Sequence, residues 1–163
     1  MKTKNTNSKT KVLLLITGSI AAVRIPLLIS QLAKENYEIR CVLSKNAEQL
    51  IKPLSLSILS RNPCILENDQ WSNCQSTPLH IELGNWADIL IIAPLTATTL
   101  AKWVTGNAEG LIPSILIANV KPTIVAPAMN TQMWRNEAVQ KNYENLQNYE
   151  NVLSLQPSEG LLA

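Results

Sequence analysis

The loop from Pro127 to Trp134 holds the side chains with the clearest capacity to bind a ligand. It reads Pro-Ala-Met-Asn-Thr-Gln-Met-Trp and follows an apolar run, residues 122–126, that we interpret as a buried parallel strand. Open α/β sheets bind ligands beyond the carboxyl ends of such strands. Asn130 can donate and accept hydrogen bonds, and Met129 and Met133 can pack against a flat ring. These residues favour a binding site; the alternative is that Asn130 caps the next helix and the methionines fill the core.

A second loop, Thr17 to Ala21, joins the first apolar run to the residues of a predicted helix. The amides at a helix N-terminus favour a phosphate, and Gly18 allows the backbone to approach it closely. The loop lacks the second and third glycines of the G-x-G-x-x-G fingerprint, so a mononucleotide fits better than a dinucleotide. An ordinary turn explains the same residues equally well.

Hydroxyl and amide side chains follow two further predicted strands. Ser44 and Asn46 come after the run 38–43, and three threonines stand in the segment Ala93 to Thr99, after the run 88–93. Because the carboxyl ends of parallel strands meet at one edge of a sheet, these side chains can complete a phosphate cradle. Ser44 or Asn46 can instead cap a helix.

His80 is the single histidine of the chain. An imidazole titrates near neutral pH, so it can remove the proton of a thiol. A single histidine is more often structural than catalytic. Glu82, two residues further on, can orient the ring, although we interpret it as a surface charge.

Four strings, in the order in which they occur, resemble one family. Residues 18–22 follow the pattern G-[GS]-[IV]-A-A, and residues 80–88 follow H-I-E-L-x-x-W-A-D. Residues 93–99 follow A-P-x-[ST]-A-x-T, and residues 127–134 follow P-x-M-N-x-x-M-W. Together they resemble the flavin-dependent cysteine decarboxylases, the family of phosphopantothenoylcysteine decarboxylase and of the enzymes that decarboxylate the C-terminal cysteine of lantibiotic precursors. The resemblance extends from residue 11 to residue 163.

The resemblance implies FMN as cofactor and decarboxylation of 4′-phospho-N-pantothenoylcysteine to 4′-phosphopantetheine in coenzyme A biosynthesis. It implies that His80 is the catalytic base and that Asn130 clamps the substrate carboxylate, with Met129 and Met133 beside it. It also implies a homotrimer or a multiple of trimers, because the active sites of the family are shared between subunits. Together with the loops above, it gives the expected cofactor-binding residues: Gly18, Ser19, Ile20, Ser44, Asn46, Thr96, Ala97, Thr99 and Ala128.

The sequence departs from the family at two places. Residues 106–111 match the family string G-x-x-D-N-L with Glu109 for Asp and Gly110 for Asn. The sequence stops at Ala163, where relatives continue with Cys-Gly-Asp, so the substrate-covering flap and its proton-donating cysteine are apparently missing: either the given sequence ends before them, or the protein lacks that step. Two alternative functions therefore stay open: a peptidyl-cysteine oxidative decarboxylase that stops at the enethiol, and a non-catalytic flavin-binding regulatory subunit.

Composition limits the remaining classes of function. The 163 residues, 46% of them hydrophobic, suit one compact domain, and the net charge of +2 without a dense basic run argues against nucleic-acid binding. Three cysteines without a C-x-x-C pair predict free thiols in a reducing cytoplasm and no metal site. The apolar run 12–16 is far too short to cross a membrane.

These loops need a sheet that presents several strand ends at one edge. The pattern predicts an α/β domain over residues 11–163 with a three-layer, doubly wound parallel sheet of Rossmann or flavodoxin-like type and helices on both faces. Residues 1–10 are too polar to join the core, and we expect a disordered leader. The expected strands are 12–16, 38–43, a short one near Ile65, 88–93, 124–126 and 152–155. The expected helices are 20–34, 46–60 with a bend or restart at Pro53, 96–104, 112–119 and 131–147, and residues 67–78 are expected to be irregular.

Overall fold

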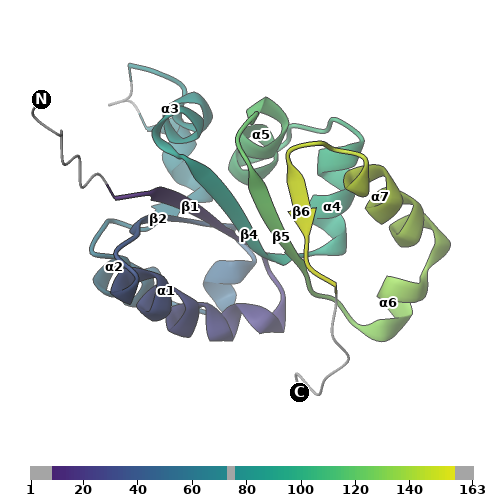
Figure 1. Ribbon diagram of the computed structural model, residues 1–163, viewed down its shortest axis with the longest axis horizontal. Coiled ribbons are helices and arrows are strands. Elements are labelled where there is room, and N and C mark those ends of the chain that lie inside the picture. The colour runs from purple at the N-terminus through teal and green to yellow at the C-terminus, as the bar shows by residue number, and fades with distance from the viewer. Residues whose placement is uncertain (1–8, 73–75, 157–163) are drawn as a thin grey trace, which may run out of the picture.

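Six parallel strands form one sheet in the computed structural model, which describes residues 9–72 and 76–156. The strand order is β3-β2-β1-β4-β5-β6 (Figure 1). The strands are β1 (Lys11–Ile16), β2 (Glu38–Leu43), β3 (Ile65–Leu66), β4 (Ile89–Leu95), β5 (Thr123–Pro127) and β6 (Val152–Ser154). This order confirms the predicted doubly wound sheet, because the chain runs outward from β1 to one edge and then returns to start the other half at β4.

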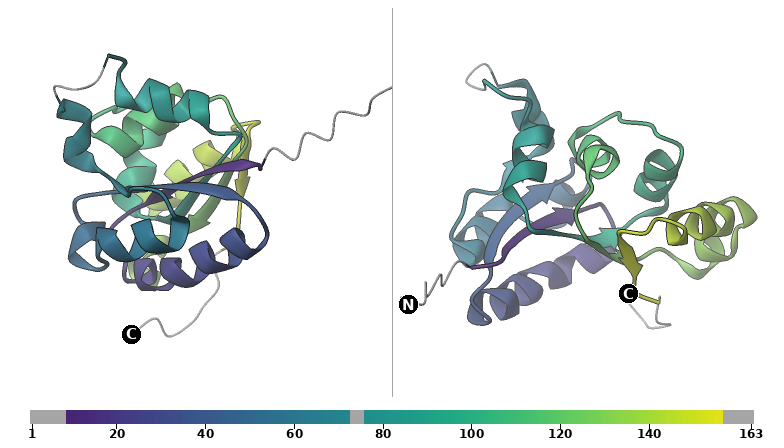
Figure 2. Two further views of the ribbon diagram at one scale, coloured as in Figure 1. Left: turned by 90° about the vertical axis from the view of Figure 1, so that its left-hand side faces the viewer. Right: turned by 45° about the horizontal axis from the view of Figure 1, so that its top comes forward.

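Helices cover both faces of the sheet, as Figure 2 shows from two sides. The α-helices are α1 (Ile25–Lys34), α2 (Pro53–Ser60), α3 (Leu79–Trp86), α4 (Ala97–Val104), α5 (Leu111–Ala118), α6 (Thr131–Arg135) and α7 (Glu137–Gln147). Three short 3-10 helices also occur: η1 (Ile20–Arg24), η2 (Ala47–Gln49) and η3 (Glu67–Trp71). Helices α1 and α2 pack on one face, and α3, α4, α5 and α7 pack on the other.

Strand β1 is the centre of the core because side chains on both of its faces are buried. Leu13 and Leu15 point into the layer formed with α3, α4 and α5. Val12, Leu14 and Ile16 point into the layer formed with α1 and α2. A strand covered on both faces has no polar side, which explains why its sequence reads as a continuous apolar run.

The two helical layers do not cover the sheet equally. On the α1 side, the buried layer is built around β1 and β2, with Ala93 of β4 at its border. Further along this side, Leu153 of β6 is 62% exposed and the following Leu155 is 50% exposed. Part of an apolar sheet surface therefore faces the solvent in the isolated chain.

Most expected elements are confirmed. The segment 67–78, expected to be irregular, begins with the 3-10 helix η3, and three other elements differ in instructive ways. The predicted helix 131–147 is wrong as one unit, because Asn136 adopts an extended conformation and its side chain caps α7 by accepting from the Ala138 amide. The predicted helix 20–34 begins with the 3-10 turn η1, and its α-helical part starts at Ile25 with Pro26 in the first turn. The sequence did not predict α3, the helix that carries His80.

Three further expectations can be placed against the structure. The restart at Pro53 is confirmed, since η2 ends at Gln49 and α2 begins at Pro53. The expected disordered leader lies almost entirely outside the described residues, as do Cys74 and the end of the chain where the flap is expected to be missing. No helix within the described ranges combines the length and the apolar character that a membrane span requires.

Candidate active site

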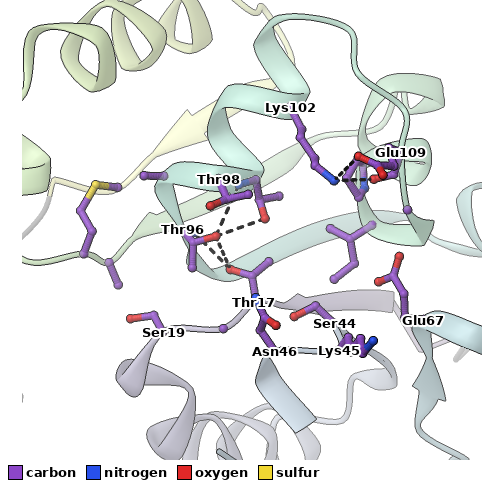
Figure 3. Close-up of a pocket in the computed structure, with 18 of the residues that line it drawn as sticks. Thr17, Ser19, Ser44, Lys45, Asn46, Glu67, Thr96, Thr98, Lys102 and Glu109 are labelled. Atoms are coloured by element: carbon purple, nitrogen blue, oxygen red, sulfur yellow. Dashed lines mark hydrogen bonds and ion pairs between the residues drawn. The ribbon is translucent and has the colours of Figure 1, made fainter. Parts of the chain in front are cut away.

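A cavity of about 550 Å³ opens at the carboxyl edge of the sheet (Figure 3). Its walls are the loops that follow β1, β2, β4 and β5, the strands that flank the point where the chain reverses direction across the sheet. Most of the expected cofactor- and substrate-binding residues line it: Gly18, Ser19, Ser44, Asn46, Thr96, Ala97, Thr99, Ala128, Met129, Asn130 and Met133. Four segments far apart in the sequence therefore converge. This agrees with the prediction that loops after parallel strands meet at one edge of the sheet.

The turn after β1 requires glycine for steric reasons. A Cβ atom on Gly18 would lie 2.5 Å from the Cβ of Asn46, a distance at which one of the two loops would have to move. Ser19 caps η1, its hydroxyl oxygen accepting from the Ala21 amide at 3.5 Å. Ser44 makes the equivalent contact after β2, accepting from the Ala47 amide at 3.3 Å. Both serines accept these bonds through oxygen, so their hydroxyl hydrogens stay available to a ligand.

Three threonines join the loop after β4 to the end of β1. Thr17 is 2% exposed, and its hydroxyl donates to the Pro94 carbonyl at 2.6 Å. The same oxygen accepts from the Thr96 amide at 3.1 Å. The Thr96 hydroxyl donates to that of Thr99 at 3.2 Å and caps α4 by accepting from the Thr99 amide at 3.4 Å. This network fixes the loop after β4 relative to the turn after β1 before any ligand binds.

Asn130 caps a helix and lies at the cavity wall. Its Oδ1 accepts from the Met133 amide at 2.8 Å, so the side chain caps α6 and the helix-cap interpretation is confirmed. The amide NH2 group has no hydrogen-bond partner among the described residues and lies at the cavity wall. Met129 and Met133 line the same wall, and Met133 is 44% exposed. The cap fixes the rotamer while leaving two N–H donors for a ligand.

The far end of the cavity is charged, which no pattern in the sequence predicted. Lys102 forms an ion pair with Glu109, Nζ to Oε2 at 3.1 Å, and also donates to the Glu109 carbonyl at 3.0 Å. Glu67 accepts from the Leu111 amide at the start of α5 at 2.6 Å. Gly110 has a φ of +109°, and a Cβ there would lie 2.6 Å from the Glu67 Oε1. Gly110, which departs from the family string, thus leaves space for the Glu67 carboxylate. This carboxylate caps α5, a role that the side chain of the N-cap residue itself often has.

Other lining residues were also missed by the sequence analysis. They are Thr17, Lys45, Glu67, Thr98, Lys102, Glu109, Gly110, Ile112 and Pro113. Thr17 lies in the predicted loop 17–21 and Lys45 lies between Ser44 and Asn46, so the sequence placed both residues in the correct loops without assigning them a contact.

Two expected site residues do not line this cavity. Ile20 is 44% exposed on η1, outside the lining. His80 is half-buried on α3 and lines a separate cavity of about 60 Å³, together with Asn85 and Lys121. Within one chain the candidate base and Asn130 therefore lie at different places.

The described cysteines are not suited to redox chemistry. Cys41 and Cys64 are free thiols. Burial, and then the nearby Cys64, raises the pKa of Cys41 to about 12. Burial, and then the carboxylates of Asp69 and Glu48, raises the pKa of Cys64 to about 12. Both remain protonated near neutral pH, and no cluster of metal-ligating side chains occurs in residues 9–72 or 76–156.

Comparison with known proteins identifies the family. A family model described as flavoprotein matches residues 1–163. The chain belongs to the flavoprotein family. The probable phosphopantothenoylcysteine decarboxylase of Streptococcus mutans is 36% identical to this flavoprotein over 155 residues, which cover 94% of this chain and 86% of the relative.

Other relatives are much longer than this flavoprotein. The coenzyme A biosynthesis bifunctional protein CoaBC of Escherichia coli is 38% identical over 134 residues, 82% of this chain, but the match covers 33% of CoaBC. The chain therefore spans about a third of the length of that relative.

Solved structures show the same architecture. A phosphopantothenoylcysteine (PPC) decarboxylase C175S mutant complexed with pantothenoylaminoethenethiol matches with a TM-score of 0.82 at 34% identity, covering 93% of this chain and 84% of that one. The FMN-dependent cysteine decarboxylase SpaF matches with a TM-score of 0.83 at 29% identity, covering 91% and 86%.

Proposed function

We propose that this flavoprotein binds FMN and decarboxylates 4′-phospho-N-pantothenoylcysteine to 4′-phosphopantetheine, a step of coenzyme A biosynthesis, in the cytoplasm. The observation that carries the proposal is the convergence of the Gly18 turn, the Thr96–Thr99 loop and Asn130 in one cavity. The similarity to the Streptococcus mutans relative and to the PPC decarboxylase structure supports the choice of substrate.

The cavity fits FMN in size and in chemistry. Its volume of about 550 Å³ lies in the range of small-molecule sites. We assign the phosphate to Gly18, Ser19, Ser44 and Asn46, since the glycine permits close approach and the serine hydroxyls are free to donate. We assign the isoalloxazine ring to Thr96, Ala97, Thr99 and Ala128, beside the methionines. When bound, FMN supplies the two-electron chemistry that the decarboxylation of a cysteine derivative needs.

Asn130 is assigned to the substrate carboxylate. Its unpartnered NH2 group can donate to a carboxylate oxygen, and the bond from the Met133 amide to Oδ1 prevents the side chain from presenting its oxygen instead. Met129 and Met133 add apolar contact beside a carboxylate held by these N–H donors.

His80 is assigned the removal of the substrate thiol proton, which requires a second copy of the chain. Within one chain, His80 and Asn130 line different cavities, so the base of one copy has to reach the cavity of another. The solvent-facing apolar side chains Ile81, Met133 and Leu153 give such an assembly a surface to bury. We propose a homotrimer or a multiple of trimers, in accord with the family resemblance.

A peptidyl-cysteine decarboxylase is the second candidate function. The similarity to SpaF, an FMN-dependent cysteine decarboxylase, favours it. The non-catalytic regulatory subunit is less well supported, because this chain has both His80 and Asn130.

The two enzymatic candidates differ in the mass of their product. The FMN-loaded protein is incubated with 4′-phospho-N-pantothenoylcysteine or with a peptide ending in cysteine, and the products are measured by mass spectrometry with carbon dioxide release. We expect 4′-phosphopantetheine from the first substrate. A product two hydrogens lighter indicates an enethiol and hence the oxidative reaction. Flavin-loaded protein that releases no carbon dioxide from either substrate contradicts both candidates.

A further inference from the structure

A second cavity, of about 360 Å³, adjoins the candidate active site. Ala128 and Met129 line both cavities, so the two spaces share the wall that lies next to Asn130. The second cavity is otherwise formed by the strand ends of β4 and β5, by η1 and the start of α1, and by residues that follow β6. A molecule held by Asn130 at one end can therefore extend past Met129 into this space.

The walls of the second cavity are mostly apolar, with Arg24 and Gln156 as the two polar side chains among the described residues that line it. Ala93, Ala126, Pro127, Trp134 and Leu155 supply aliphatic and aromatic surface. Arg24 is the single charged residue among the described residues that line it. An apolar cavity with one guanidinium matches a ligand that has an aliphatic body and an anionic end.

The Arg24 side chain makes no hydrogen bond or ion pair with another described residue. It occupies the N-cap position of α1 without making a side-chain capping bond, and its side chain is exposed. The ion pairs between described residues join Arg40 to Glu82 and Lys102 to Glu109, so Arg24 is in neither. A cation beside a helix N-terminus is unfavourable unless an anion compensates it. The geometry thus leaves a fork of N–H donors available at the cavity.

We infer that the second cavity holds the non-reacting arm of the substrate and that Arg24 binds the terminal phosphate of that arm. The inference rests on the proposed function, because it takes the substrate to be phosphorylated. The branched aliphatic part of the arm packs against Ala126 and Leu155, and the dianionic phosphate receives paired N–H bonds from the guanidinium. The cofactor phosphate stays assigned to the first cavity, since Gly18 and Ser19 line that cavity and Arg24 does not.

Arg24 is therefore a specificity-determining residue, and its effect is visible only with a phosphorylated substrate. The test compares the FMN-loaded wild type with Arg24→Met and Arg24→Lys, each assayed with 4′-phospho-N-pantothenoylcysteine and with N-pantothenoylcysteine. Lys34→Met is the matched control, because Lys34 is an exposed cation on the same helix that lines neither cavity.

We expect Arg24→Met to raise the KM for the phosphorylated substrate by about 100-fold, with kcat little changed, because methionine cannot make the paired charged hydrogen bonds to the phosphate. The KM for the dephosphorylated substrate is expected to stay the same. Arg24→Lys should fall between, since a lysine keeps the charge but loses the fork. Lys34→Met should behave as the wild type with both substrates.

Three other outcomes separate the inference from the proposed function. An Arg24→Met protein that still prefers the phosphorylated substrate overturns the inference, and so does one that loses FMN, which would place Arg24 at the cofactor. If the wild type turns over neither substrate, the proposed function fails. In that case the FMN-loaded protein is titrated with 4′-phosphopantothenate and with pantothenate, and binding is followed by the flavin spectrum. Tighter binding of the phosphorylated ligand that Arg24→Met abolishes supports the inference. Equal binding of the two ligands by the wild type overturns it.

Discussion

The hydroxyl oxygens of Thr17 and Thr96 lie 3.3 Å apart across the boundary between β1 and β4, although 79 positions separate the two residues. The Thr17 hydroxyl also donates to the Pro94 carbonyl and accepts from the Thr96 amide. One buried side chain thus joins the turn assigned to the phosphate to the loop assigned to the flavin ring, and holds both in place without a ligand.

Thr17→Val is expected to weaken FMN binding and to lower stability. Valine has the same shape but leaves the Pro94 carbonyl and the Thr96 amide without a partner, which costs about 1–3 kcal/mol for buried groups. Urea unfolding of the apoprotein measures the stability, and titration with FMN measures the affinity. Thr17→Ser keeps the hydroxyl and serves as the control. Equal FMN affinity in the valine and serine variants would show that the bond does not organise the site.

Gly18→Ala is expected to reduce FMN retention by at least about tenfold, because the added methyl forces the loops of Gly18 and Asn46 apart and so weakens their hydrogen bonds to the phosphate. The measure is the ratio of flavin absorbance to protein after gel filtration. Gly84→Ala is the matched control: a Cβ at Gly84 meets nothing within 4 Å, and the position is helical. The control should keep its flavin and gain a few tenths of a kcal/mol or more in stability. Flavin loss in both variants would point to a general folding defect.

His80→Asn is expected to leave the protein yellow and to slow decarboxylation by at least about 100-fold, the lower range for losing a positioned acid–base group. Flavin retention should persist because His80 lies outside the cavity assigned to FMN. Carbon dioxide release, measured beside the flavin spectrum, gives both quantities on one sample. Near-normal turnover would identify His80 as a structural residue.

Asn130→Asp is expected to keep α6 capped, since Oδ1 still accepts from the Met133 amide, while it removes the NH2 donors and repels the substrate carboxylate. Alone, the variant should be yellow and inactive. Refolded together with His80→Asn in equal amounts, it should regain activity at about one quarter of the sites if each site takes one residue from each of two copies. Absence of any recovery in mixed oligomers would contradict the shared site.

Cys41 and Cys64 are expected to resist iodoacetamide at pH 8 in the folded protein, because both thiols have pKa values of about 12. Peptide mass spectrometry resolves each residue, and labelling in urea gives the reference. Below pH 9 the thiols are protonated in both states, whereas between pH 9 and pH 12 only the unfolded chain releases the protons. The free energy of unfolding should therefore fall as the pH rises through this interval, and fall less steeply in Cys41→Ala. Rapid native labelling of Cys41 would show that its strand opens readily.

The sheet and the four binding loops could be predicted from the sequence because their signals are local. Ser19, Ser44, Thr96 and Asn130 each follow an apolar run within a few residues, and the rule for parallel strands brings such positions to one edge. No distance between them was needed to predict that they meet.

The charged end of the cavity and helix α3 could not be predicted from the sequence, because they leave no local pattern in it. Glu67 caps α5 across 44 positions, and Lys102 on α4 reaches Glu109 in the loop that joins α4 to α5. Helix α3 has eight residues, with Gly84 near its middle, too short for a periodicity to stand out. The separation of His80 from Asn130 likewise depends on how α3 packs against α5, which the H-I-E-L string does not encode.

The adjacency of β1 and β4 makes the affinity for a flavin a property of the whole domain. The cavity is lined by residues 17–19, residues 44–46 and Glu67 from the first half of the chain and by residues from 96 onward, so neither half of the chain forms the cavity alone. A ligand that requires both halves stabilises the folded state by mass action, by about 2.7 kcal/mol at a free concentration one hundred times its Kd. Cofactor supply would then govern how long this polypeptide survives cellular proteases, which links its abundance to riboflavin status.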